Sequence, residues 1–271
     1  MTEGRMLSGC ATPLSNNCRV AATKPLSSDE TTSHSTRLSK DNSQVAGYVL
    51  CPLSSVNAVL FDLDGTFADT APDLAAALNH TRAARNLPPL PLEVIRPQAS
   101  HGSRGLLKLG FDIEPDAPGY DTLRDLFLDY YERNICVHTQ LFGDMGELVA
   151  ELERRNIKWG IVTNKPHRYT VPLMQALGYA ERAACLISGD TCAHAKPHPE
   201  PMLKACELIG VSPEQCLYLG DDLRDMQAAN AAAMPGIIAR YGYINDDASE
   251  ANWNAQGGVD KPMELIRFLT L

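Results

Sequence analysis

The residues with the clearest capacity for chemistry are two aspartates that follow an apolar run. In VNAVLFDLDGT, which begins at Val56, Asp62 and Asp64 come at the end of the apolar residues and Gly65 follows them. A carboxylate at the end of a buried strand is costly unless something compensates for its confinement. The pair therefore indicates a site at which a cation or a substrate provides that compensation.

Other polar side chains follow other apolar runs in the same way. Thr163 and Asn164 end GIVTN, Lys196 lies in the loop AHAKPHPEP, and Asp221 and Asp222 close CLYLGDD. If these runs are parallel strands, their carboxyl ends meet at one edge of a sheet, where open α/β proteins bind ligands. We therefore expect acids, a hydroxyl and a lysine to converge there.

These residue types suit phosphoryl transfer through a carboxylate nucleophile. Asp62 can form an aspartyl-phosphate, which splits a difficult hydrolysis into two easier steps. Because a carboxylate repels a phosphate, a cation is needed, and Asp62 with Asp221 offers the hard oxygen ligands that Mg²⁺ prefers. Lys196 and Thr163 would stabilise the developing negative charge. Asp64 would protonate the leaving alkoxide and then activate water.

Short apolar runs alternate with helical patterns over the rest of the chain. The predicted strands are 56–62, 158–164, 184–188, 216–221 and 236–242, and the predicted helices are 144–156, 168–178, 199–210 and 223–233. Alternation of this kind predicts βαβ units in a parallel sheet. The right-handedness of their crossovers then gives an α/β fold with a doubly wound, Rossmann-like core.

Three segments make up the predicted domain organisation. Residues 68–141 are mainly helical and too long for a loop between neighbouring strands, so we expect them to form an inserted helical cap domain over the site. Residues 56–67 and 142–271 would form the α/β catalytic core. Residues 1–55 are rich in serine and threonine without periodicity, and we expect a disordered tail or a stretch that is not translated.

Four motifs resemble those of the haloacid dehalogenase superfamily, in the same order, over Val56 to the C-terminus. They are DLDGT, VTNK, KPHPEP and GDDLRD. The resemblance implies that Asp62 is the nucleophile, Asp64 the general acid and base, and that Thr163 and Lys196 contact the phosphate. It also implies Mg²⁺ bound by Asp62, Asp221 and the backbone carbonyl of Asp64. The second aspartate of the first motif favours a phosphatase over a dehalogenase.

A finer resemblance is to the bacterial N-acetylmuramic acid 6-phosphate phosphatases of peptidoglycan recycling. It rests on stretches such as WGIVTNKPHRYTVPLMQALG and on the loop SHGSRGL, although His101 stands where that group would have a glycine. His101, Arg104 and Asn164 are candidate substrate-binding residues, and Arg104 could hold a substrate carboxylate. Phosphoglycolate also carries a carboxylate, so a phosphoglycolate phosphatase of metabolite repair stays open.

Another alternative is a binding protein that has lost activity on the same scaffold. A relative of that kind would be expected to lack Asp62, Asp64 or Lys196, and this chain has all three. Asp222 and Asp225 have two interpretations as well. They either hold the metal ligands in place or support the start of the helix after Asp222, and we favour the first. The loop residues His194 and His198 are expected to lack metal-ligand partners.

Composition limits the partners of the protein. The formal charge of −9 argues against nucleic acid, and no apolar run reaches the length of a membrane span. The eight scattered cysteines favour free thiols in a reducing cytoplasm. We therefore expect a cytoplasmic monomer or homodimer that acts on a small anionic phosphate ester.

Overall fold

The structure is a computed structural model that describes residues 56–244 and 250–269. The expectation for residues 1–55 lies outside the described residues. None of the helices in the described ranges is both long and apolar enough to cross a membrane.

A six-stranded parallel sheet forms the centre of the fold, in the order β5-β4-β1-β6-β7-β8. The strands are β1 (Ala58–Phe61), β4 (Lys158–Val162), β5 (Leu186–Ile187), β6 (Cys216–Gly220), β7 (Gly236–Ala239) and β8 (Gly257–Val259). The first five confirm the predicted strands. The sixth was not predicted, because Gly-Gly-Val is too short to stand out as an apolar run.

Both faces of the sheet are buried. In β1, Val59 and Phe61 join one hydrophobic cluster, whereas Ala58 and Leu60 join the cluster on the opposite face. This follows from the two-residue period of strand side chains. Strands covered on both faces read as continuous apolar runs, which is why VNAVLF shows no polar alternation.

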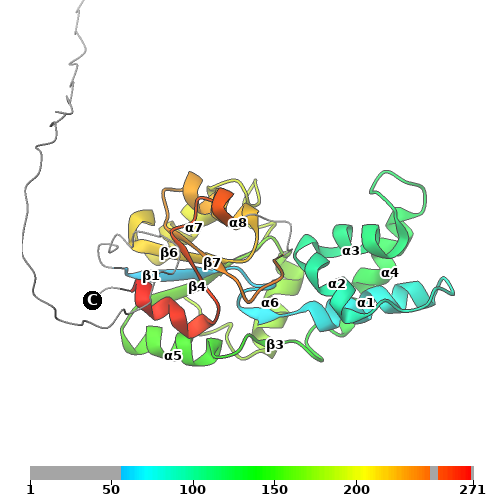
Figure 1. Cartoon of the computed structure of the whole chain (residues 1–271), viewed down its shortest axis with the longest axis horizontal. Helices are drawn as coiled ribbons and strands as arrows, with labels where there is room; N and C mark the ends of the chain where they lie inside the picture. Colours follow the sequence, from blue (N-terminus) through cyan, green and yellow to red (C-terminus); the bar gives the residue numbers. More distant parts are fainter. Residues whose placement is uncertain (1–55, 245–249, 270–271) are drawn as a thin grey trace, which may run out of the picture. The chain divides into compact units, whose positions relative to one another are not determined.

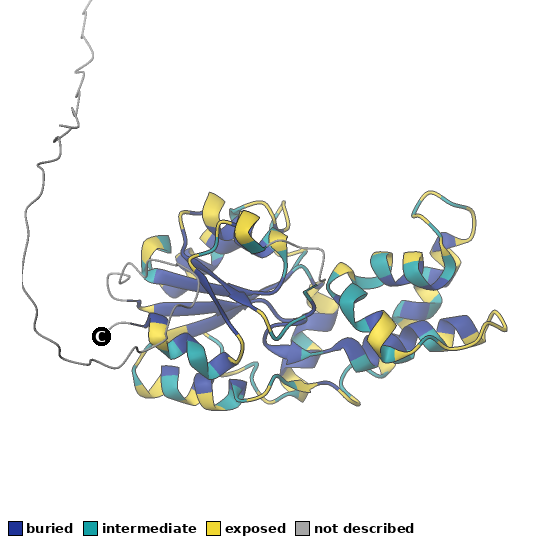
Figure 2. Ribbon diagram, viewed as in Figure 1, coloured by how far each residue is buried: buried dark blue, intermediate teal, exposed yellow. Residues whose placement is uncertain are grey.

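Helices cover the two faces in a doubly wound arrangement. Residues of α5 (Met145–Arg154) and α6 (His167–Ala176) pack in the first cluster, and those of α7 (Glu200–Ile209) and α8 (Leu223–Ala231) pack in the second. Figure 1 shows α7 and α8 on the opposite side of the sheet from α5, and Figure 2 shows the buried strands between them. The four helices and the predicted α/β fold class are confirmed.

The segment between β1 and α5 is a helical insertion with a hydrophobic cluster of its own. Its helices are α1 (Ala71–Ala83), α2 (Leu92–Ile95), α3 (Gly102–Phe111) and α4 (Tyr120–Arg133), with the 3-10 turn η1 (Arg96–His101) before α3. Tyr169 and Tyr243 of the core also contribute to this cluster. The two ends of the insertion pair as a short antiparallel ribbon, β2 (Ala68–Asp69) with β3 (Gln140–Leu141). Its role as a cap stays a prediction.

Candidate active site

Three predicted site residues follow three adjacent strands. Asp62 comes directly after β1, Thr163 after β4 and Asp221 after β6, and β1 pairs with both of the other strands. The chain order of the strands reverses at β1, so these carboxyl ends lie at a switch point of the sheet. Open α/β sheets bind ligands in the crevice at such a point.

The ammonium group of Lys196 lies between the carboxylates of Asp62 and Asp225 and contacts both. Its ammonium nitrogen lies 2.8 Å from Oδ1 of Asp62 and 2.6 Å from Oδ1 of Asp225, and it also contacts the Tyr218 hydroxyl at 2.8 Å. Burial lowers the pKa of Lys196, but the charges of Asp225 and Asp62 outweigh this effect and the net shift is upward. The buried lysine is therefore a fixed cation beside the predicted nucleophile.

Asp62, Asp221 and Asp225 form a buried acidic cluster. Each offers a carboxylate oxygen within 4.8 Å of the others. Burial, together with the charges of Asp62 and Asp225, raises the pKa of Asp221 well above its ordinary value. Lys196 contacts two of these three acids and offsets only part of their charge. A divalent cation with a preference for oxygen ligands would offset the remainder, and this donor set fits Mg²⁺.

The position of Asp221 is fixed from several sides. The Thr66 hydroxyl donates to Oδ1 at 2.8 Å, and the backbone N–H of Tyr243 donates to Oδ2 at 2.9 Å. Gly65 has a φ of +90°, and a Cβ atom on it would collide with Oδ2 of Asp221. The turn after the first motif therefore requires glycine for both its conformation and its close approach to the carboxylate.

Asp64 lies outside this acidic cluster and has its own partners. The Thr70 hydroxyl donates to Oδ1 of Asp64 at 2.6 Å, and the ammonium group of Lys165 lies 2.8 Å from the same oxygen. Lys165 is buried, and its nitrogen lies 4.8 Å from the ring centroid of Tyr131. The sequence interpretation missed Lys165, although it directly follows Asn164 in the VTNK motif.

Asn164 fixes the loop that carries Lys196. Its side-chain amide donates to the carbonyl oxygen of Lys196 at 2.9 Å, and its Oδ1 accepts from the backbone N–H of Lys196, also at 2.9 Å. The neighbouring Thr163 accepts from the backbone N–H of Lys165 at 3.1 Å. Asn164 therefore contacts the backbone of the lysine loop as well as lining the cavity described below.

Asp222 and Asp225 together cap the start of α8. Asp222 accepts from the backbone N–H of Arg224 at 2.8 Å, and Asp225 accepts from the backbone N–H of Asp222 at 3.1 Å, which is a capping box. Asp225 also belongs to the acidic cluster, and its predicted support of the metal ligands stays a prediction. For Asp222 the structure shows helix capping and an ion pair with Arg224. Support of a metal by Asp222 stays a prediction.

A cavity of about 300 Å³ lies over these groups and reaches the insertion. Nine predicted site residues line it: Asp62, Asp64, His101, Arg104, Thr163, Asn164, Lys196, Asp222 and Asp225. Asp221 does not line it. Among the lining residues that the sequence interpretation missed, those with aromatic or cationic side chains include Tyr131, Lys165, Arg168, Tyr169 and Arg224. They come from four different segments, and no shared motif marks them.

The insertion and the core meet directly at this cavity. The guanidinium group of Arg224 donates to the carbonyl oxygen of Ser100 at 2.8 Å, which joins α8 to η1. The stretch SHGSRGL that the sequence suggested to be a loop is helical: His101 ends η1 and Arg104 lies in the first turn of α3. Both residues are exposed, and Arg104 lies 3.8 Å from Glu114. The insertion therefore supplies cationic and polar side chains to the wall of the cavity.

The expectation that His194 and His198 lack metal-ligand partners is wrong. Each offers a ring nitrogen within 4.8 Å of the other and of a carboxylate oxygen of Glu200. Glu200 was missed as a partner because two prolines separate it from His194 in HAKPHPEP. The sequence alone does not show that the chain turns there and brings Glu200 back to the histidines.

Comparison with known proteins agrees with this geometry. Residues 56–233 match the family model described as haloacid dehalogenase-like hydrolase. The chain is 44% identical to an N-acetylmuramic acid 6-phosphate phosphatase from Pseudomonas putida, over 79% of this chain and 96% of that protein. It is 43% identical to a phosphoglycolate phosphatase from Xanthomonas campestris, over 77% of this chain and 94% of that protein.

The fold is similar to solved structures as well. The crystal structure of a predicted phosphoglycolate phosphatase from Haemophilus somnus has a TM-score of 0.72 at 25% identity, covering 80% of this chain and 100% of that chain. The four motifs, the parallel sheet and these matches agree. The chain belongs to the haloacid dehalogenase-like hydrolase family.

Proposed function

We propose that the protein is a Mg²⁺-dependent phosphomonoester hydrolase that acts through an aspartyl-phosphate on Asp62. The observation that carries this proposal is the position of Asp62, which lines the cavity, contacts Lys196 at 2.8 Å and shares a buried acidic cluster with Asp221. Asp62 and Asp221 would hold the metal, with the backbone carbonyl of Asp64. Bound Mg²⁺ supplies positive charge that allows a carboxylate to approach a phosphate.

Different residues of this chain would perform the successive steps of the reaction. A carboxylate oxygen of Asp62 attacks phosphorus, the bond from phosphorus to the ester oxygen breaks, and Asp64 gives its proton to the leaving alkoxide. Asp64 then takes a proton from water, which attacks the aspartyl-phosphate, so that inorganic phosphate leaves and Asp62 is regenerated. Lys196 and Thr163 would hold the phosphoryl oxygens throughout.

The substrate that we propose is N-acetylmuramic acid 6-phosphate. The cavity has an apolar and aromatic wall that includes Leu74, Phe127 and Tyr169, which suits a sugar ring and an acetyl group better than a two-carbon acid. Arg104 and Arg168 also line the cavity and would hold the lactyl carboxylate. Relatives of both names are similar to this chain to nearly the same degree, so phosphoglycolate remains the second candidate.

The rate of phosphate release in the presence of Mg²⁺ tests the proposal. It is measured for N-acetylmuramic acid 6-phosphate and for 2-phosphoglycolate at equal enzyme concentration, with the Asp62→Asn variant as the inactive control. We expect kcat/KM for N-acetylmuramic acid 6-phosphate to exceed that for 2-phosphoglycolate by about tenfold or more, the discrimination that additional apolar contacts in a pocket give. Asp62→Asn should fold normally and release no phosphate. Preference for 2-phosphoglycolate would overturn the substrate assignment, and activity retained by Asp62→Asn would overturn the nucleophile.

A further inference from the structure

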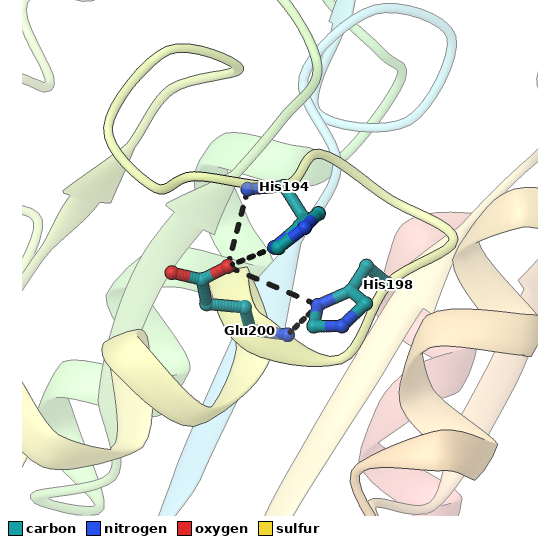
Figure 3. Close-up of side chains that lie close together, drawn as sticks. All are labelled: His194, His198 and Glu200. Atoms are coloured by element: carbon teal, nitrogen blue, oxygen red, sulfur yellow. Dashed lines mark hydrogen bonds and ion pairs between the residues drawn. The ribbon is translucent and has the colours of Figure 1, made fainter.

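A second group of metal-ligating side chains lies on the loop that carries Lys196. His194 and His198 flank Lys196 in this loop, and Glu200 is the first residue of α7. Figure 3 shows the two imidazole rings and the carboxylate turned toward one another. Lys196 itself contacts Asp62 and is buried, whereas the two histidine side chains are 62% and 49% exposed. The histidines are therefore open to ions in solution.

Two of the spacings among the three groups are close to those of a small coordination sphere. The Nδ1 atom of His194 lies 2.8 Å from Oε2 of Glu200, and the Nδ1 atom of His198 lies 3.9 Å from the same oxygen. Nitrogen and oxygen ligands about 2.0–2.1 Å from a tetrahedral Zn²⁺ are separated by roughly 3.3 Å. The two distances lie on either side of that value, and rotation of the two imidazole rings out of their present hydrogen bonds would direct all three groups at a common ion.

The carboxylate is held in place by the backbone of the loop. The N–H groups of Ala193 and His194 donate to the two carboxylate oxygens of Glu200, at 3.2 and 3.1 Å. The backbone N–H of Glu200 in turn donates to Nδ1 of His198 at 3.2 Å. A ring nitrogen that accepts a hydrogen bond carries no proton, and its lone pair can bind an ion once that hydrogen bond is released. The loop therefore holds the Glu200 carboxylate in place before any ion binds, whereas the two imidazole rings, which are stacked with their centroids 4.3 Å apart, would have to turn toward the ion.

We propose that His194, His198 and Glu200 form a second cation site, selective for zinc-like divalent ions and separate from the acidic cluster around Asp62. Two imidazoles with one carboxylate suit Zn²⁺, whereas Mg²⁺ prefers an all-oxygen environment. The exposed side of the cluster leaves a position for water. An ion held there would tie the two ends of the segment 194–200 together and restrain the loop that presents Lys196.

Cobalt binding tests this proposal on the full chain, since Co²⁺ replaces Zn²⁺ and its visible spectrum reports the ligands. Titration in excess Mg²⁺ keeps the acidic cluster occupied, and Asp221→Asn serves to show that any Co²⁺ signal is independent of that cluster. The test variant is His194→Ala/His198→Ala, and the matched control is His138→Ala, which removes another exposed histidine outside the cluster. Thermal unfolding with and without Zn²⁺ provides a second measurement.

We expect the wild type, Asp221→Asn and His138→Ala to bind one equivalent of Co²⁺ with a tetrahedral d–d spectrum, and Zn²⁺ to raise their Tm. The double variant should bind at least tenfold more weakly and lose the Zn²⁺-dependent rise in Tm. Equal binding by the double variant would overturn the proposal. So would absence of binding in the wild type, or a thiolate charge-transfer band, which would assign the ion to cysteines.

Discussion

The ammonium group of Lys165 lies 2.8 Å from a carboxylate oxygen of Asp64, and both residues line the cavity. Thr70 donates to the same carboxylate oxygen at 2.6 Å. The proposed acid and base is thus held by two donors, one from the turn into α1 and one from the loop after β4. A positioned carboxylate transfers protons efficiently only when its orientation toward the leaving group is fixed. We therefore expect Lys165 to act as a positioning residue for Asp64.

Substitution of Lys165 should have an effect that depends on the leaving group. Lys165→Met keeps an apolar stem against Tyr131 but removes the contact with Asp64. We expect kcat for a sugar phosphate, whose alkoxide needs a proton, to fall by roughly ten- to a hundredfold. The leaving group of p-nitrophenyl phosphate needs no proton. The rate of the first step, transfer of the phosphoryl group to Asp62, should therefore be unchanged for this ester. The exposed Lys261→Met is the control. Equal loss on both esters in the first step would contradict a role through Asp64.

Neutralisation of Asp221 should stabilise the metal-free protein. The folded-state pKa of Asp221 is raised above its ordinary 3.8 by burial first and by Asp62 and Asp225 next. The folded state therefore favours the protonated form, and this group lowers stability progressively as pH rises above 3.8 toward the folded pKa. At neutral pH, with a chelator present, Asp221→Asn should have a higher Tm than the wild type.

The same variant should lose its response to Mg²⁺. Ligand at about a hundred times its Kd stabilises a protein by about 2.7 kcal/mol, which is roughly 5–10 °C in Tm for a chain of this size. We expect a rise of this order in the wild type, and little or none in Asp221→Asn. Calorimetry with chelator and with Mg²⁺ measures both effects. A full Mg²⁺-dependent rise in the variant would show that Asp221 is not a ligand.

Arg104 should contribute to binding of the anionic sugar ester. Its side chain is 73% exposed and its contact with Glu114 is long, at 3.8 Å, so it is available to a substrate carboxylate. Arg104→Ala should raise KM for N-acetylmuramic acid 6-phosphate by about tenfold, the loss of one charged hydrogen bond, and leave KM for p-nitrophenyl phosphate nearly unchanged. Arg133→Ala, at the end of α4 and 77% exposed, is the control. Equal effects of Arg104→Ala on both esters would remove this role.

The ion pair between Asp222 and Arg224 should be sensitive to acid. Burial raises the pKa of Asp222, but the hydrogen bonds and charge of Arg224 outweigh it and the net shift is downward from 3.8. A lowered folded pKa gives stability that is present above 3.8 and is lost as pH falls through the folded value. Asp222→Asn keeps a cap acceptor for α8, so the comparison isolates the charge.

Denaturant unfolding of the wild type and Asp222→Asn measures this contribution. The wild type should be more stable by about 0.5–1 kcal/mol at pH 7, since the pair is partly exposed. The difference should shrink once the pH falls below 3.8. A difference that stays constant down to pH 2 would mean that the charge of Asp222 does not contribute.

The sheet and its acidic residues could be predicted because they are local features of the chain. Buried parallel strands leave continuous apolar runs, and the carboxyl ends of adjacent strands converge wherever the runs are parallel. Asp62, Thr163 and Asp221 follow from that rule alone. The resemblance to known motifs added their roles, which remain predictions.

Lys165 stands in the VTNK motif, whereas other missed residues depend on tertiary contacts that no local pattern shows. Tyr131 is near the end of α4 and reads as one more core aromatic, yet the packing of α4 brings it over Lys165. Arg224 reads as a charged residue on a helix, and only the approach of the insertion gives it Ser100 as a partner. The strand β8 and the ribbon of β2 with β3 are too short for periodicity to indicate them.

The most direct test of the account is the fate of the phosphoryl group in Asp64→Asn during reaction with p-nitrophenyl phosphate. This ester needs no acid for its leaving group, whereas hydrolysis of the aspartyl-phosphate needs Asp64 to activate water. We predict a burst of nitrophenolate equal to the enzyme concentration, followed by slow turnover, with the phosphoryl group on Asp62 by peptide mass spectrometry. A phosphoryl group on any other residue, or linear release without any phosphorylated peptide, would contradict the account.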